Sequence, residues 1–409
     1  MGSEPGMAWN WCVNLAQYCE LHIITEGEFR HKIEKALPML PKGGGNMHFY
    51  YNPVPDRIRR MCWNQGDWRF YKYYKEWQYK TYEMALEIIE THKIDIVHQL
   101  NMIGFREPGY LWKIDGIPFV WGPVGGIKTF PTAYLNNAGI KQQLFHRLKN
   151  ALNILQLKYS PRVRKALRRA DLIISAIPDS YFAIKKYHGL ESVIIPETGC
   201  YENQSPYSHD ENSGNNINIF NIIWVGKFDY RKQLNIALQT IAHIKNDLSG
   251  DRVQLHIIGT GSPDQISYYK KISQQLEIDD VVKWHGQIAN NEVMDIMSIS
   301  QLFFFTSVNE DTSTVVLEAL SNKLPVVCFN ACGFGAVIDD TVGYKIDLTT
   351  PKKSAKEFAD KICYLYNHKD ILQTMANNCT QRRKELSWER KAEQMVAIYD
   401  KVLNKQAID

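Results

Sequence analysis

The spacing of apolar residues in the second half of the chain predicts a regular alternation of strands and helices. Short apolar runs, typical of buried strands, are separated by longer segments in which apolar residues recur every three or four positions. Strands are expected at 221–225, 254–258, 281–284, 302–306 and 326–329. Helices are expected between them at 234–248, 264–276, 292–298 and 314–321. This alternation is typical of a mostly parallel sheet with helices on both faces.

The first half of the chain contains similar elements. Short runs rich in Ile and Val predict buried parallel strands at 21–25, 94–98, 119–121, 172–176 and 192–195. A helix is expected at 79–91, where the apolar residues fall on one face. The predicted fold class is therefore α/β, with two doubly wound, Rossmann-like domains that face a cleft. Ligands of such folds bind beyond the carboxyl ends of the strands, so the chemistry is expected in the loops that follow strands.

Composition indicates one domain boundary. Residues 203–218 are rich in Asn, Ser, Asp and Gly, which is typical of a linker or an exposed loop. We therefore predict an N-terminal domain at 1–202, a linker at 203–218 and a second domain at 219–386. The remaining segment, 387–409, carries the apolar stripe of one amphipathic helix.

Composition and charge exclude several classes of protein. Hydrophobic residues make up 44% and charged residues 22%, which is typical of a folded globular chain and not of a disordered one. The net charge of +4 is too small to indicate nucleic-acid binding. The eight cysteines form no Cys-x-x-Cys pair, which argues against a zinc or redox motif. No apolar stretch reaches the roughly 20 residues of a membrane span and no secretory signal is visible, so a cytoplasmic location is expected.

Two glutamates follow the strand expected at 302–306. Glu310 comes just before a predicted helix, and Glu318 lies inside it, with seven residues between the two. If Thr312 or Ser313 caps this helix, its free N–H groups point toward the cleft and form a site for phosphate. Glu318 could then accept hydrogen bonds from a ribose and Glu310 from a sugar hydroxyl. The alternative is two solvated carboxylates near a helix start.

Cations follow the first strand of the second domain. Lys227 lies in the loop and Lys232 at the start of the next helix. Positive side chains near a helix N-terminus oppose the helix dipole, so a bound anion is the natural compensation. Arg231 could replace Lys232 as the anion ligand, and a merely solvated pair is the alternative.

A glycine-containing turn follows the second strand of the same domain. Gly259 and Gly261 give the first part of a dinucleotide motif, but its third glycine is absent because residue 264 is Asp. An NAD(P)-dependent oxidoreductase is therefore a weak alternative, and a tight turn that serves a mononucleotide fits as well.

The order of these features resembles the nucleotide-sugar half of retaining GT-B glycosyltransferases of family 4, the glycosyl transferases group 1. The features are Gly226 and Lys227 with Lys232, the Gly259–Gly261 turn, His285-Gly286, the Glu310 and Glu318 pair, and Leu324-Pro325-Val326-Val327. By this resemblance, the two lysines hold the donor diphosphate, Glu310 contacts the transferring sugar and Glu318 holds the ribose. The resemblance also implies a donor pocket lined by Gly226, Arg231, Gly259, Gly261, Asp311, Thr312, Ser313 and Thr314. One departure is Asp311-Thr312-Ser313, where the family often has Gly-Phe-Gly.

The first domain is similar to one branch of the same family through the segments 2–6, 76–78, 95–99, 105–109 and 121–126. This resemblance implies an acceptor-binding first domain, to which the C-terminal helix returns, with His98 in a catalytic position near the acceptor or the transferring sugar. A satisfied core histidine is the alternative for His98. The acceptor or loop residues implied are Gly2, Ser3, Glu4, Gly6, Arg106, Gly125 and Gly126.

In that family the Gly2–Gly6 loop follows a first buried strand. Our hypothesis is that this strand is missing here through truncation or a misassigned start codon. Its loss would open the middle of the first sheet.

The segment 146–169 carries many Lys and Arg residues, no acidic residue, and interleaved Leu and Ile. It predicts a basic amphipathic surface that could contact anionic lipid, where a lipid-linked acceptor would lie. A solvated basic helix is the alternative.

The function expected from the resemblance is retaining transfer of a sugar from a nucleotide-diphosphate sugar to a hydroxyl of a glycan or lipid-linked acceptor, in cell-surface polysaccharide biosynthesis. No metal ion is expected, because two lysines can take its place. No cofactor and no nucleic-acid partner are expected either. A non-catalytic module that binds a nucleotide or a glycan is the alternative.

Overall fold

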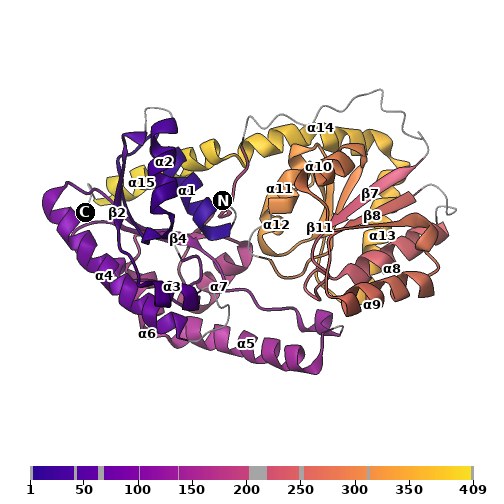
Figure 1. The fold of residues 1–409 in the computed structure, drawn as a ribbon, viewed down its shortest axis with the longest axis horizontal. Coiled ribbons are helices and arrows are strands. Elements are labelled where there is room, and N and C mark those ends of the chain that lie inside the picture. The colour runs from indigo at the N-terminus through magenta and orange to yellow at the C-terminus, as the bar shows by residue number, and fades with distance from the viewer. Residues whose placement is uncertain are drawn as a thin grey trace.

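The structure is a computed structural model that describes residues 3–40, 44–62, 69–100, 102–136, 138–201, 219–247, 253–310 and 314–406. Two α/β lobes lie side by side, and helices from the end of the chain run from one to the other (Figure 1). None of the helices in the described ranges combines the length and hydropathy that a membrane span requires.

The C-terminal lobe is built on a six-stranded parallel sheet in the order β12-β11-β10-β7-β8-β9. Its strands are β7 (Phe220–Val225), β8 (Val253–Ile258), β9 (Val282–Gly286), β10 (Leu302–Phe305), β11 (Val326–Phe329) and β12 (Gly343–Ile346). The helices that accompany them are α8 (Leu234–Asp247), α9 (Pro263–Gln275), α10 (Asn290–Ile299), α11 (Thr314–Ser321), α12 (Cys332–Val337), α13 (Pro351–Asn367) and α14 (Lys369–Glu385). Strands β10 and β11 are apolar throughout and fully buried because both faces of the sheet are covered.

The strand order places a switch point in this sheet. From β7 the chain builds outward through β8 and β9, and it then returns to the other side of β7 for β10 and β11. Leu302 of β10 lies opposite Ile222 of β7, so the loops that follow these two strands leave the sheet next to each other. In doubly wound sheets this is where ligands bind.

The sheet of the N-terminal lobe is divided into two pieces within the described residues. One piece has the order β3-β4-β5-β6, with β3 (Val97–Gln99), β4 (Phe119–Val124), β5 (Leu172–Ser175) and β6 (Val193–Ile194). The other pairs β1 (Leu21–Thr25) with β2 (Met47–Tyr51), a strand that the apolar pattern did not predict. The helices of this lobe are α1 (Ser3–Leu15), α2 (Arg30–Ala36), α3 (Asp56–Cys62), α4 (Phe70–Thr91), α5 (Ile140–Tyr159), α6 (Pro161–Arg169) and α7 (Pro178–His188).

The loop expected at residues 2–6 is a helix from Ser3 onward, so that prediction was wrong. Glu4 lies in the first turn of α1, where a carboxylate complements the helix dipole. Met7, Trp11 and Leu15 recur every four residues and are buried in the core of the lobe. Burial of this apolar face explains why the segment continues as a helix.

The two lobes are joined by segments that cross between them. Helix α15 (Trp388–Gln406) packs along α1, and the rings of Trp388 and Trp11 meet edge to face at 5.7 Å (Figure 1). In the other direction, Tyr134 extends from the N-terminal lobe into the core of the C-terminal lobe. The predicted linker at 203–218 lies outside the described residues, and the division into domains stays a prediction.

Candidate functional site

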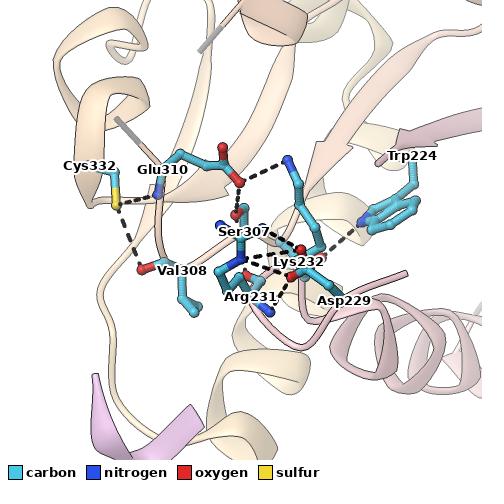
Figure 2. A network of polar contacts seen from close by, with 9 residues as sticks. Trp224, Asp229, Arg231, Lys232, Ser307, Val308, Glu310 and Cys332 are labelled. Carbon is cyan, nitrogen blue, oxygen red and sulfur yellow. Dashed lines mark hydrogen bonds and ion pairs between the residues drawn. The ribbon is translucent and has the colours of Figure 1, made fainter. Parts of the chain in front are cut away.

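The switch point of the C-terminal sheet brings together two residues that the sequence singled out. Nζ of Lys232, in the loop after β7, lies 2.8 Å from Oε1 of Glu310, which follows β10 (Figure 2). Ser307 Oγ donates a hydrogen bond to the same oxygen at 3.0 Å. The two charged side chains are only 16% and 20% exposed, so their ion pair is screened less than a surface pair.

Buried hydrogen bonds fix the backbone beneath this ion pair. The indole N–H of Trp224 donates to Thr306 Oγ1 at 2.9 Å, and that hydroxyl donates to the carbonyl of Lys232 at 2.7 Å (Figure 2). The N–H of Val308 donates to the carbonyl of Arg231 at 2.9 Å. The loop after β7 is therefore tied to the segment after β10, and Lys232 is held in a defined position.

Glu310 is also held from its other side. Its N–H donates to Cys332 Sγ at 3.4 Å, and the Cys332 thiol lies 3.7 Å from the carbonyl oxygen of Val308 (Figure 2). Cys332 has a φ of 56°, an uncommon conformation for a residue with a side chain. Sequence reasoning missed both Ser307 and Cys332. The position of Ser307 three residues before Glu310 was an available signal, whereas nothing in the sequence marks Cys332.

The same loop carries further positive charge. Lys227 is exposed and has no ion-pair partner among the described residues. Arg231 lies 2.6 Å from Asp229, and hydrogen bonding to that carboxylate raises the pKa of the guanidinium. Lys227, Arg231 and Lys232 thus outnumber Asp229 and Glu310 by one positive charge, which suits an incoming anion at these loops.

The glycines of the two neighbouring loops allow their backbones to touch. Gly259 has a φ of 135°, and a Cβ there would lie 1.8 Å from the carbonyl oxygen of Gly226. Gly226 N–H in turn donates to the carbonyl of Ile258 at 3.0 Å. At Gly261, a Cβ would lie 2.8 Å from Phe228 Cβ. These glycines are therefore needed for packing between the loops after β7 and β8.

The start of α9 is closed by its own side chains. Ser262 Oγ accepts from the N–H of Gln265 at 3.3 Å, and Gln265 Oε1 accepts from the N–H of Ser262 at 2.8 Å. Pro263, between them, has no N–H. Two amides at this helix start are thus engaged and Pro263 provides none, which disfavours an NAD(P) site here.

Glu318 lies inside α11, the helix that follows Glu310 in the chain. It is half-buried, and burial raises the pKa of its carboxyl group. Among the described residues nothing hydrogen-bonds to that carboxylate or pairs with it, so it is available to a ligand. The helix begins at the exposed Thr314. Asp311, Thr312 and Ser313, predicted at the donor pocket, lie outside the described residues.

His98 lies in the middle of β3, whereas it was expected at the end of a strand. Its Nε2 donates to the carbonyl of Gly122 at 2.7 Å, and its Nδ1 accepts from Tyr399 of α15, also at 2.7 Å. Burial lowers its pKa to about 4, which favours the neutral ring. Both ring nitrogens are engaged, as in the satisfied histidine that was the alternative interpretation. A role at the acceptor stays a prediction.

Other predicted residues of the first domain meet around the loop after β3. Glu4 accepts from the N–H of Ile103 at 3.3 Å, and Gly125 donates to the carbonyl of Ile103 at 2.8 Å. Gly126 has a φ of 73°, and a Cβ there would lie 3.6 Å from Gly104 Cα. A Cβ at Gly125 would lie 2.7 Å from Cγ2 of Ile103. The close approach at these glycines is therefore to protein atoms, and a ligand is not needed to explain it.

The remaining predicted residues lie elsewhere. Arg106 turns toward α5, where it donates to Gln156 Oε1 at 2.6 Å and to the side chain of Asn153. Gly6 is buried within α1. Gly2 lies outside the described residues, as does the side chain of Ser3.

A cavity of about 470 Å³ lies between the lobes. Its wall on the N-terminal lobe comes from α5, α7 and the loop after β4, and Asn330, Ala331 and Gly335 close it on the C-terminal lobe. Asn330 is two residues from Cys332, which contacts Glu310. The cavity therefore lies next to the segment that carries Cys332, and it could hold a second substrate.

This chain is similar to known proteins in part of its sequence and in its architecture. The family described as glycosyl transferases group 1 matches residues 209–384, which carry the site. The match covers less than half of the chain, so it shows that this region is similar to that family. A D-inositol 3-phosphate glycosyltransferase of Saccharomonospora viridis is 21% identical over 183 residues, 44% of this chain and 42% of the relative. The alignment thus spans less than half of that curated relative.

Solved structures establish the architecture. The structure of Anabaena Alr3699/HepE in complex with UDP covers 98% of both chains with a TM-score of 0.60 and 14% identity. WaaG, a glycosyltransferase involved in lipopolysaccharide biosynthesis, covers 98% of this chain and 96% of its own with a TM-score of 0.54 and 16% identity. The fold is therefore the two-domain GT-B arrangement of Rossmann-like lobes, as predicted.

Proposed function

We propose that this protein is a retaining glycosyltransferase of family 4 that moves a hexose from a nucleotide-diphosphate sugar to a hydroxyl of a glycan or lipid-linked acceptor, in cell-surface polysaccharide biosynthesis. The observation that carries this proposal is the contact between Lys232 and Glu310 at the switch point, with the exposed cation Lys227 on the same loop. The family match and the UDP bound to the HepE structure support a nucleotide-sugar donor. The lipopolysaccharide role of WaaG supports a polysaccharide product.

The proposed chemistry is stabilisation of a leaving diphosphate. Negative charge grows on the leaving oxygen as the sugar departs, and the ammonium groups of Lys227 and Lys232 interact with it more strongly in the transition state than in the ground state. Glu310 holds Lys232 in place and accepts a hydrogen bond from a sugar hydroxyl. The acceptor hydroxyl attacks C1 of the sugar from the face that the diphosphate leaves, which retains the anomeric configuration. The C1–O bond to the diphosphate breaks, and the leaving diphosphate oxygen takes the proton of the acceptor hydroxyl. Glu318 accepts hydrogen bonds from the ribose.

The proposed reaction needs no metal ion or cofactor. A divalent ion would neutralise the diphosphate, and the amines of Lys227 and Lys232 do the same with fixed positive charge. Activity in excess chelator should equal activity in buffer. An absolute requirement for magnesium or manganese would contradict this part of the proposal.

The proposed division of labour follows the lobes. Residues 219–386 bind the donor, residues 1–202 bind the acceptor, and the C-terminal segment 387–409 belongs structurally with the first domain. The cavity between the lobes is the proposed place of the acceptor, and a lipid-linked acceptor implies peripheral contact with an anionic membrane.

A panel of UDP-, GDP- and ADP-sugars tests the proposal. A donor that binds the folded protein raises its unfolding temperature in a concentration-dependent way, and that donor should then be turned over with retention when extracts containing acceptors are added. Replacement of Glu310 by Ala should abolish turnover. Nucleotide binding with the same residual turnover in the wild type and the Glu310→Ala variant would favour the non-catalytic module. Fluorescence titration with NADH should show no binding, because the start of α9 is closed.

A further inference from the structure

Helix α5 turns its apolar side chains outward. Seven of them are between 43% and 84% exposed, namely Ile140, Leu144, Phe145, Leu148, Leu152, Leu155 and Tyr159. At 3.6 residues per turn these positions fall within an arc of about 140°, so they form one continuous face. A surface helix normally turns such a face toward the core. This exposed set is called the α5 face below.

The opposite side of α5 buries Leu157 and is anchored by hydrogen bonds from polar side chains. His146 Nε2 lies 2.5 Å from the hydroxyl of Tyr230. The side chain of Asn150 accepts from the N–H of Phe130 at 2.8 Å and donates to its carbonyl at 2.9 Å. Asn153 donates to the carbonyl of Lys128 at 3.2 Å. Rotation of the helix to bury its leucines would break all of these bonds, so the outward direction of the α5 face is fixed by the fold.

Positive charge borders the α5 face. Arg147 and Lys158 lie along one edge of the arc and Lys149 along the other, while Lys141 lies within it near the start of the helix. Helix α6 adds the exposed Lys165 and Arg168. Neither helix contains an acidic residue. A partner of this surface must therefore be apolar in the middle and negative around it.

We propose that the α5 face is a membrane-docking surface, on which α5 lies in the plane of an anionic bilayer with its apolar side chains among the acyl chains. The helix is about 30 Å long at 1.5 Å per residue, and it lies at the outer edge of the molecule (Figure 1). A helix with a wide apolar face and flanking Lys and Arg residues is the kind that binds at membrane interfaces. The inference rests on the membrane contact that the proposed function includes, and it names the surface that makes this contact.

Charge favours a membrane over a second copy of the chain. In a symmetric dimer the same patch meets itself, so the cations at the edges of the α5 face would be brought toward their own kind. Anionic headgroups instead attract those cations by roughly 1 kcal/mol for each one that reaches the surface. Self-association is therefore the less favourable way to cover these leucines.

Vesicle flotation tests the proposal. Wild-type protein should float with vesicles of phosphatidylcholine and phosphatidylglycerol and bind vesicles of phosphatidylcholine alone at least about tenfold more weakly, with binding that falls as salt rises. Replacing Leu144, Leu148 and Leu155 together by Gln should lower the partition coefficient on anionic vesicles at least about tenfold. Replacing Arg147 and Lys149 by Gln should lower it about tenfold on anionic vesicles only.

Matched controls separate this surface from general effects. Gln in place of Met39 and Tyr268, which are also exposed but lie outside α5, should leave flotation unchanged. Circular dichroism and thermal unfolding should match the wild type for every variant, because the replaced side chains are exposed. Flotation that survives the leucine replacements, or its absence with the wild type, would overturn the proposal. So would a dimer in sedimentation velocity that the same replacements dissociate without any vesicle binding, since the α5 face would then join two copies.

Discussion

Lys232 and Glu310 gain their defined geometry from neighbours that carry no charge. Ser307 holds the carboxylate of Glu310, and Cys332 accepts a hydrogen bond from the backbone N–H of the same residue. Thr306 holds Lys232 through the backbone carbonyl of the lysine. The ammonium group is therefore preorganised before an anion arrives, which lowers the reorganisation needed when charge develops. The types of both residues were predictable from their places after strands. Their mutual contact was not, because it depends on β10 returning beside β7.

The ion pair gives a direct prediction for turnover. Lys232→Ala should lower kcat by about 10²- to 10³-fold, the range for loss of one group that stabilises transition-state charge, and should weaken donor binding. Glu310→Gln keeps the shape of the side chain but removes its charge, so it should lower kcat with little effect on donor binding. Initial rates and isothermal titration with the nucleotide measure these effects. Lys271→Ala, an exposed change on α9, is the matched control and should behave like the wild type.

His98 gives a prediction for pH. Its pKa of about 4 in the folded protein lies below the ordinary value of 6.5. Between these two values the unfolded chain binds a proton that the folded protein does not, so stability is lost as pH falls from about 6.5 to about 4. The loss from this ring amounts to up to about 3 kcal/mol.

His98→Gln, which does not titrate, should flatten this part of the pH profile. Urea unfolding at a series of pH values measures the slope. Some slope should remain, because burial also lowers the pKa of His256 to about 4. An unchanged profile in the variant would show that His98 is not held neutral in the fold.

The loops after β7, β8 and β10 act as one element, because their backbones are bonded to each other. Gly226 bonds to Ile258, Phe228 to Thr260 at 2.9 Å and Val308 to Arg231. The apolar runs were sufficient to predict the strands that carry these loops, and the helix at 314–321 and the strand at 326–329 have the predicted bounds. A single sequence could not predict the contacts between the loops, because each contact joins residues that are far apart in the chain.

Gly259 should be the most sensitive position of this loop cluster. In Gly259→Ala the new methyl would lie 1.8 Å from Gly226 O at a φ of 135°, so the loops must separate. We expect a loss of more than about 2 kcal/mol in unfolding free energy, together with weaker donor binding. Gly286→Ala is the matched control. Its φ is also positive, at 71°, but no atom lies within 4 Å of the added Cβ.

Gly286→Ala should therefore lower the unfolding free energy by only about 1 kcal/mol, which is the cost of the left-handed backbone conformation alone. Denaturant titration of both variants gives the comparison. Equal losses at Gly259 and Gly286 would mean that the loops are not packed together as described.

In the N-terminal lobe the sequence predicted the helices and strands less completely. β2 was missed because Met-His-Phe-Tyr-Tyr has no Ile or Val and alternates weakly, and all but its first residue are half-buried. The first helix was mistaken for a loop because the corresponding segment is a loop in the family that the chain resembles, whereas here Trp11 and Leu15 pack against the returning α15. Tertiary contacts with the end of the chain thus support a helix at this position.

At the scale of the whole molecule, the lobes are held by side chains that cross from one to the other. The sequence predicted two α/β units, and it could not indicate that Tyr134 enters the core of the other lobe. The Tyr134 hydroxyl lies 2.7 Å from Ser354 Oγ and accepts from the N–H of Thr349 at 2.9 Å. Its backbone carbonyl accepts from the side chain of Gln233, next to Lys232, at 2.7 Å. These contacts of Tyr134 form a seam between the lobes, and the seam reaches the loop after β7 that carries Lys232.

Tyr134→Phe should weaken this seam without touching the donor site. The ring stays buried, but the hydroxyl partners of Thr349 and Ser354 are lost in a dry environment, so the unfolding free energy should fall by about 1–3 kcal/mol. Because the carbonyl contact to Gln233 is a backbone one and survives, nucleotide affinity should be unchanged. Tyr268→Phe removes an exposed hydroxyl and should change neither quantity. A double-mutant cycle with Ser354→Ala should give a coupling of about 1 kcal/mol, as residues in contact do. Additive effects would mean that Tyr134 and Ser354 do not hold the two lobes together.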